Sequence, residues 1–179
     1  MFINQIWILS ILEDQPYKDV KIFWKLFEKK YRSVGVQIFS HPHITFQGGK
    51  TYNLGQLKKD FQKTVSKIKP FEIEVSGIAH FNKKVIYLKV EKTNNLIELN
   101  NLINQFLKEH CKSLLEYYLP KNWIPHICLA MDNLTERDFE KAWDELKDSK
   151  FRFKQKLHNI CIVKRHPDGK IKIAKKYEL

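Results

Sequence analysis

Two short segments, one in each half of the chain, place a histidine in the same local context. Residues 40–46 read SHPHITF and residues 123–129 read WIPHICL. Both contain the tripeptide Pro-His-Ile, and both are apolar enough to form a short buried strand. His43 and His126 are therefore the residues in this sequence that most clearly invite a chemical interpretation.

The spacing of these motifs predicts which side chains share a face. Residues two apart in a strand point the same way, so His43 lies beside Thr45, and His126 lies beside Cys128. The isoleucine between the two members of each pair points the other way, into the core. Each strand thus offers one imidazole and one small donor group side by side.

Two such pairs facing each other suit phosphodiester chemistry. A histidine titrates near neutral pH, so one imidazole can take a proton from the attacking group. A second, protonated imidazole can give a proton to the leaving oxygen. A small donor can hold a non-bridging phosphate oxygen as charge builds in the transition state. This scheme needs no metal and no cofactor.

The elements around the motifs follow one order in both halves, which predicts a duplicated α+β fold. Strand, helix, Pro-His-Ile strand, helix and strand occur twice. We expect two sheets with outer helices, related by a pseudo-two-fold axis, with the two histidines facing one another across a central cleft. The predicted unit is one bilobal domain over residues 1–179, with lobe halves of roughly 1–81 and 82–179.

Local signals fix several of these elements. Asn53 is placed to cap a helix that Pro70 stops, and Thr135 with Asp138 makes a capping box for another. The alternating segments near the C-terminus predict strands on both sides of a Pro-Asp-Gly turn. Their outward faces would form a Lys-rich surface, either solvated or in contact with a phosphate backbone.

Composition narrows the function class. With 43% hydrophobic residues, the chain of 179 residues can bury a sizeable core. The net charge of +12 favours a polyanionic partner, or simply keeps the protein in solution. Three cysteines without CxxC spacing predict neither a disulfide framework nor a zinc ribbon, so a cytoplasmic location is the simplest. The apolar run 6–12 is too short to cross a membrane, and we expect no membrane partner.

The repeated motif resembles that of the 2H phosphoesterase superfamily, which includes 2′-5′ RNA ligase-like proteins and RNA 2′,3′-cyclic phosphodiesterases. That family carries H-x-[ST] in each half, here with Pro before each His. The resemblance also covers residues 71–81 (FEIEVSGIAHF), the KVIYLKV strand and Tyr177. It implies catalytic roles for His43, His126 and Thr45, metal-independent action, and 2′-5′ bonds or 2′,3′-cyclic phosphates as substrates.

Two positions depart from the family pattern. Cys128 stands where Ser or Thr is expected, and a thiol is a weak donor. Met131 stands near where the family often has an Arg. Thr45, Cys128 and Trp123 are the predicted substrate-binding residues. Trp123 could stack on a base at the cleft mouth or plug a loop.

The prediction is a monomeric phosphodiesterase acting on RNA ends or oligonucleotides, with no metal. Which histidine is acid and which is base stays open at this stage. The alternatives are an RNA-binding module whose catalysis is weakened or lost, and 2′-5′ ligation by reversal. A metal-dependent hydrolase using His41 and His43 is a further option, because such a pair could bind an ion with a third ligand.

Overall fold

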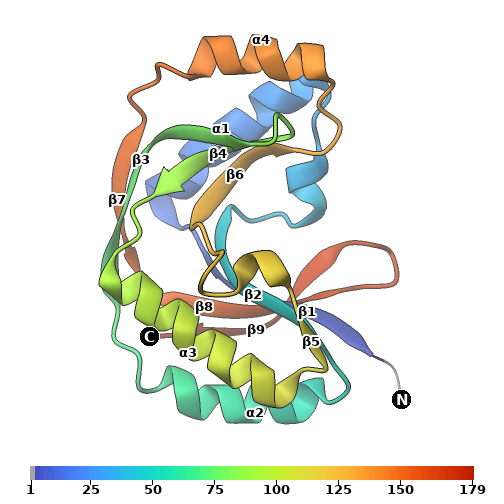
Figure 1. The fold of residues 1–179 in the computed structure, drawn as a ribbon, viewed down its shortest axis with the longest axis vertical. Helices are drawn as coiled ribbons and strands as arrows, with labels where there is room; N and C mark the ends of the chain where they lie inside the picture. The colour runs from blue at the N-terminus through green and yellow to red at the C-terminus, as the bar shows by residue number, and fades with distance from the viewer. Residues whose placement is uncertain (1–2) are drawn as a thin grey trace.

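The computed structural model describes residues 3–179 and folds into two antiparallel sheets with helices on their outer faces (Figure 1). The first sheet has the strand order β5-β2-β1-β8-β9. Its strands are β1 (Asn4–Ile11), β2 (His43–Thr51), β5 (Ser113–Leu114), β8 (Asn159–Arg165) and β9 (Ile171–Glu178). The second sheet has the order β6-β4-β3-β7. Its strands are β3 (Phe71–Phe81), β4 (Val85–Val90), β6 (His126–Met131) and β7 (Arg152–Leu157).

In the described part of the chain, four α-helices and two 3₁₀ helices connect the strands. They are α1 (Asp14–Tyr31), η1 (Gly35–Ile38), α2 (Leu54–Val65), α3 (Asn94–His110), η2 (Glu116–Tyr118) and α4 (Glu136–Leu146). In Figure 1, α1 and α4 lie over the second sheet, and α2 and α3 lie over the first. The side chain of Asn53 accepts a bond from the Gln56 amide at 3.0 Å. That of Thr135 accepts one from the Asp138 amide at 3.1 Å, so both predicted caps are confirmed.

The expected fold class is confirmed, because the two sheets are built on one plan. Reading from the motif strand, the order β2-β1-β8-β9 corresponds to β6-β4-β3-β7. A shared hydrophobic core runs through both lobes and includes Ile44 and Ile127, which are fully buried as their strand positions predict.

The boundary expected near residue 81 does not separate the lobes. Strand β3 from the first half pairs with β4 and β7 in the second sheet. Strand β8 from the second half pairs with β1 in the first sheet. The halves therefore exchange their inner strands, and each lobe contains residues from both halves.

The predicted Lys-rich sheet surface is also divided by this exchange. Strand β7 lies at an edge of the second sheet and β9 at an edge of the first. On β7, the Lys154 ammonium lies 2.8 Å from a Glu72 carboxylate oxygen, and Arg152 forms an ion pair with Glu74. The lysines of the two segments do not make one continuous sheet face, and part of their charge is already paired.

Candidate active site

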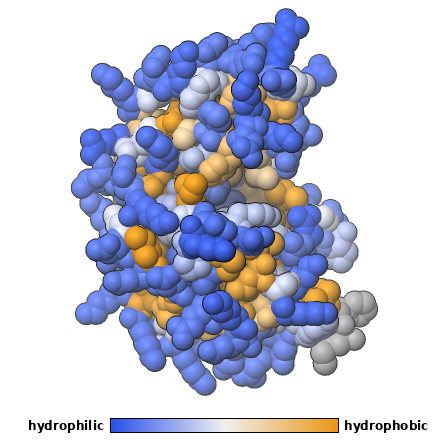
Figure 2. All heavy atoms as spheres, in the orientation of Figure 1, coloured by the Kyte–Doolittle hydropathy of each residue, from blue (hydrophilic) through white to orange (hydrophobic). Residues whose placement is uncertain are grey.

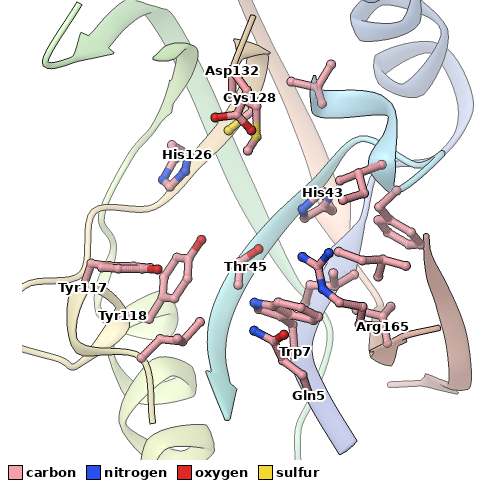
Figure 3. Close-up of a pocket in the computed structure, with 18 of the residues that line it drawn as sticks. Gln5, Trp7, His43, Thr45, Tyr117, Tyr118, His126, Cys128, Asp132 and Arg165 are labelled. Atoms are coloured by element: carbon pink, nitrogen blue, oxygen red, sulfur yellow. The ribbon is translucent and has the colours of Figure 1, made fainter. Parts of the chain in front are cut away.

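A cavity of about 400 Å³ lies between the sheets and is lined by all four motif side chains. His43 and Thr45 enter it from β2, and His126 and Cys128 enter it from β6 (Figure 3). In the space-filling view, apolar side chains gather at the waist between the two lobes, within a mostly hydrophilic surface (Figure 2). The structure thus brings together the two distant motifs as their strand positions predict.

The two histidines share one hydrogen-bonding geometry. Nδ1 of His43 lies 2.7 Å from the carbonyl oxygen of His41. Nδ1 of His126 lies 2.7 Å from the carbonyl oxygen of Ile124. A carbonyl oxygen only accepts hydrogen bonds, so each neutral ring carries its proton on Nδ1. Each Nε2 is left with a lone pair that can take a proton from a group in the cavity.

Burial keeps both imidazoles neutral in the free protein. Desolvation lowers the pKa of His43 from 6.5 to about 4, against the opposing effect of its bond to the His41 carbonyl. Desolvation also lowers the pKa of His126. The desolvating groups include aromatic rings, because Phe39 lies 5.2 Å from the His43 ring and Phe81 lies 5.1 Å from the His126 ring.

The two small side chains beside the histidines differ in chemistry. Thr45 is 8% exposed and brings a hydroxyl to the cavity. Cys128 brings a thiol, and burial raises its pKa to about 12. The thiol is therefore neutral at physiological pH.

Trp123 does not lie at the cleft mouth, so its predicted role in substrate binding is wrong. Its side chain is only 1% exposed and packs against Phe46, with ring centroids 5.7 Å apart. Its indole N–H donates to the carbonyl oxygen of Thr45 at 2.9 Å. Trp123 supports the backbone of a motif strand from inside the core.

The other motif strand has a matching support. The indole N–H of Trp24, on α1, donates to the carbonyl oxygen of Cys128 at 2.9 Å. In each motif, the residue two positions after the histidine thus has its carbonyl bound by a tryptophan from another element of the fold. This correspondence is not visible in the sequence, because the two tryptophans occupy unrelated positions in the two halves.

Several further cavity residues were missed by the sequence reasoning. Gln5 and Trp7 come from β1, Arg165 from the end of β8, and Tyr117 and Tyr118 from η2. Arg165 is the one Lys or Arg among the lining residues, and its guanidinium carbon lies 5.7 Å from the centre of the Trp7 ring. Pairing of β1 with β2 brings Gln5 and Trp7 to the first motif, and pairing of β8 with β1 brings Arg165. No local sequence signal encodes these long-range pairings.

Within residues 3–179, no three side chains of His, Cys, Asp or Glu are grouped so as to hold a metal ion. The expected partner of His43 in a metal site, His41, instead has its Nδ1 3.0 Å from the Ser40 hydroxyl. Over the same residues, no helix is long and apolar enough to cross a membrane.

This fold and motif pair match a known family. The sequence profile described as the 2′-5′ RNA ligase superfamily matches residues 37–169, a span that includes both motifs. The chain therefore belongs to the 2′-5′ RNA ligase superfamily, the group of 2H phosphoesterases.

Similar proteins and structures agree with this assignment. A protein of Staphylococcus saprophyticus named "Putative phosphoesterase" is 26% identical over 87% of both chains, and one of Staphylococcus epidermidis is 29% identical over 78% of both. The crystal structure of TT0787 from Thermus thermophilus superposes with a TM-score of 0.67 at 14% identity, covering 98% of this chain and 97% of that one. That of E. coli LigT complexed with NADP+ gives 0.63 at 16% identity, covering 98% of both chains. These structures share the fold of this chain.

Proposed function

We propose that this protein is a metal-independent phosphodiesterase that acts on RNA-type phosphodiesters, with His43 and His126 as the acid–base pair. The substrates are 2′,3′-cyclic phosphates or 2′-5′-linked oligonucleotides. The observation that carries the proposal is the matched geometry of the two imidazoles. Both line one cavity, and both have Nδ1 fixed by a backbone carbonyl, which leaves Nε2 for proton transfer.

His43 is the better candidate for the base. Its pKa of about 4 keeps Nε2 unprotonated at neutral pH. For a 2′,3′-cyclic phosphate, His43 takes a proton from water as the water oxygen bonds to phosphorus. His126, protonated once the substrate's negative charge raises its pKa, gives its proton to the ribose oxygen whose bond to phosphorus breaks. The Thr45 hydroxyl donates to a non-bridging oxygen throughout.

The cavity suits a nucleotide in size and surroundings. Its volume of about 400 Å³ falls in the range typical of small-molecule sites, about 300–1,000 Å³. Aromatic rings and one guanidinium surround the motif residues, and such groups contact bases and phosphates in nucleic-acid sites. E. coli LigT, which shares the fold, has been solved with phosphate and with 3′-AMP, so its fold accommodates ligands of this class.

The proposal is tested by product analysis on 2′,3′-cyclic nucleotides and 2′-5′ dinucleotides. His43→Ala and His126→Ala should each lower kcat by at least about 10²–10⁴-fold, the usual contribution of an acid or a base. His166→Ala is the matched control, because His166 lies in the β8–β9 turn and does not line the cavity. Activity should survive EDTA. Full activity in either motif variant would overturn the two-histidine mechanism.

The Cys128 thiol supports one rival, an RNA-binding module with weakened or lost catalysis, because a thiol holds a phosphate oxygen poorly. That rival predicts oligonucleotide binding that is unchanged in His43→Ala and no turnover by the wild type. Ligation by reversal predicts 2′-5′ joining of ends bearing a 2′,3′-cyclic phosphate, and the same two histidine variants would abolish it.

A further inference from the structure

The second motif lacks a hydroxyl, but a hydroxyl from another element reaches the same cavity. Tyr118, the last residue of η2, lines the cavity together with Thr45 and Cys128. It also lines a second cavity on the His126 side. In Figure 3 its phenol oxygen points into the space bordered by His126 and Thr45.

The backbone of Tyr118 is held in place by buried amides. Its carbonyl oxygen accepts from the side chains of Asn104 at 3.3 Å and Asn100 at 3.4 Å. Both asparagines lie on α3 and are at most 2% exposed. The Asn104 side chain in turn accepts from Gln47 of β2 at 2.6 Å. This network ties the backbone of η2 to the motif strand, so the segment that carries the phenol is held in place without a substrate.

The phenol is a neutral donor under physiological conditions. Burial raises the pKa of Tyr118, and the nearby Cys128 adds to that rise. Tyr118 and Thr45 line the same cavity, so both hydroxyls are available to one ligand there. A neutral phenol O–H is a far better donor to a phosphate oxygen than a thiol.

We propose that the Tyr118 hydroxyl donates to a non-bridging phosphate oxygen in the transition state, in place of the hydroxyl that Cys128 lacks. This inference rests on the proposed phosphodiesterase function. Tyr118 keeps its proton throughout, because the proton transfers belong to the two histidines. Its part is to stabilise negative charge as it builds on phosphorus-bound oxygen, alongside Thr45.

The test is a double-mutant cycle between Tyr118→Phe and Cys128→Thr. Tyr118→Phe keeps the ring and should lower kcat by about 10²–10³-fold, as losing an oxyanion donor does, with a smaller change in KM. Cys128→Thr restores a motif hydroxyl, so it should raise the rate at least tenfold more in the Tyr118→Phe background than in the wild type. Tyr52→Phe is the matched control and should stay within a few-fold of wild type, because Tyr52 is 46% exposed and does not line the cavity.

Two outcomes would overturn the inference. One is a Tyr118→Phe rate equal to that of Tyr52→Phe. The other is the same gain from Cys128→Thr in both backgrounds, since additive effects mean that the two groups do not share a role. Equal melting temperatures of the variants and the wild type would exclude a loss of fold as the cause.

A second measurement separates this inference from the proposed function. Inorganic phosphate is titrated into wild type and Tyr118→Phe, and we expect the Kd to rise about tenfold in the variant, as for a lost bond to a charged group. Loss of the proposed function would appear as absent turnover, or as turnover independent of His43, in the assays above. Equal phosphate affinity in the two proteins, or no phosphate binding by wild type, would contradict the role of Tyr118 whatever those assays show.

Discussion

At the scale of single residues, each candidate catalytic histidine is oriented by the backbone of its own motif. The carbonyl that binds Nδ1 lies two residues before the histidine in both motifs, so the ring orientation is a local consequence of the Pro-His sequence. Isoleucine then anchors each strand in the core on its opposite face. The two motifs differ chemically at one position, where the first has the hydroxyl of Thr45 and the second has the thiol of Cys128.

Keeping His43 neutral has a consequence for stability. Its pKa is about 4 in the folded protein and about 6.5 when the chain unfolds, so between these values the unfolded state binds more protons. The free energy of unfolding should therefore lose nothing to His43 protonation above pH 6.5, and it should fall as the pH drops toward 4. The loss attributable to His43 should reach about 3 kcal/mol, at about 1.4 kcal/mol per pKa unit.

The measurement is chemical denaturation at several pH values for wild type and His43→Asn. Asparagine has an amide that can still donate to the His41 carbonyl but does not titrate, so the variant should lose less stability on acidification. His126 contributes in the same direction, since its pKa is lowered too, so some pH dependence should remain. Matching pH curves for variant and wild type would show that His43 is not held neutral by the fold.

At the scale of elements, both motif strands lie at a sheet edge where the cavity forms. Strand β6 is the outermost strand of its sheet, and β5 covers β2 only opposite Gly49 and Lys50. The carbonyls of Thr45 and Cys128 therefore have no strand partner on the open side and are bound by the two tryptophans. Edge carbonyls that would otherwise be buried and unpaired are thus bound by indole N–H groups from outside the strands.

Trp24→Phe and Trp123→Phe should each lower the free energy of unfolding by about 1–3 kcal/mol, because each leaves a buried carbonyl without its donor. Both should also lower kcat, since the strand that carries a proposed catalytic histidine loses a fixed contact. The measurements are chemical denaturation and kcat on a cyclic nucleotide. Trp143→Phe, on α4 and outside the cavity, is the control and should leave kcat unchanged. A loss of kcat as large in Trp143→Phe as in the other two would contradict the special role of the strand contacts.

At the scale of the whole molecule, sequence patterns predict the features that are set by residues close together in the chain, such as strand faces and helix starts. Strand alternation places Thr45 beside His43, and short-range capping signals place the starts of α2 and α4. Buried and exposed residues do not alternate along most of β8, because both of its faces are buried. Its partner β1 lies about 150 residues away in the chain, so no local pattern indicates this pairing. The residues that this pairing brings to the cavity, Arg165 among them, could not be found from local patterns.

The overall charge of +12 is consequently a poor guide to where a polyanion binds. Lys154 and Lys172 lie in different sheets, and each is already close to a carboxylate, Glu72 at 2.8 Å and Asp168 at 3.4 Å. Arg165 instead lines the cavity, with its guanidinium near the Trp7 ring. The cation that should matter most for an oligonucleotide is thus set by position in the fold rather than by local lysine density.

Arg165→Met should weaken oligonucleotide binding and reduce its salt dependence. Losing one phosphate contact to a single strand lowers the slope of log K against log salt by about 0.7, because one fewer counterion is released. Titrations of a labelled 2′-5′ oligonucleotide at several salt concentrations measure this slope. Lys154→Met and Lys172→Met are matched controls, which should change the slope less because their charges are paired outside the cavity. An equal fall in slope for all three variants would mean that the oligonucleotide follows the general positive surface, and Arg165 would then have no special role as a phosphate contact.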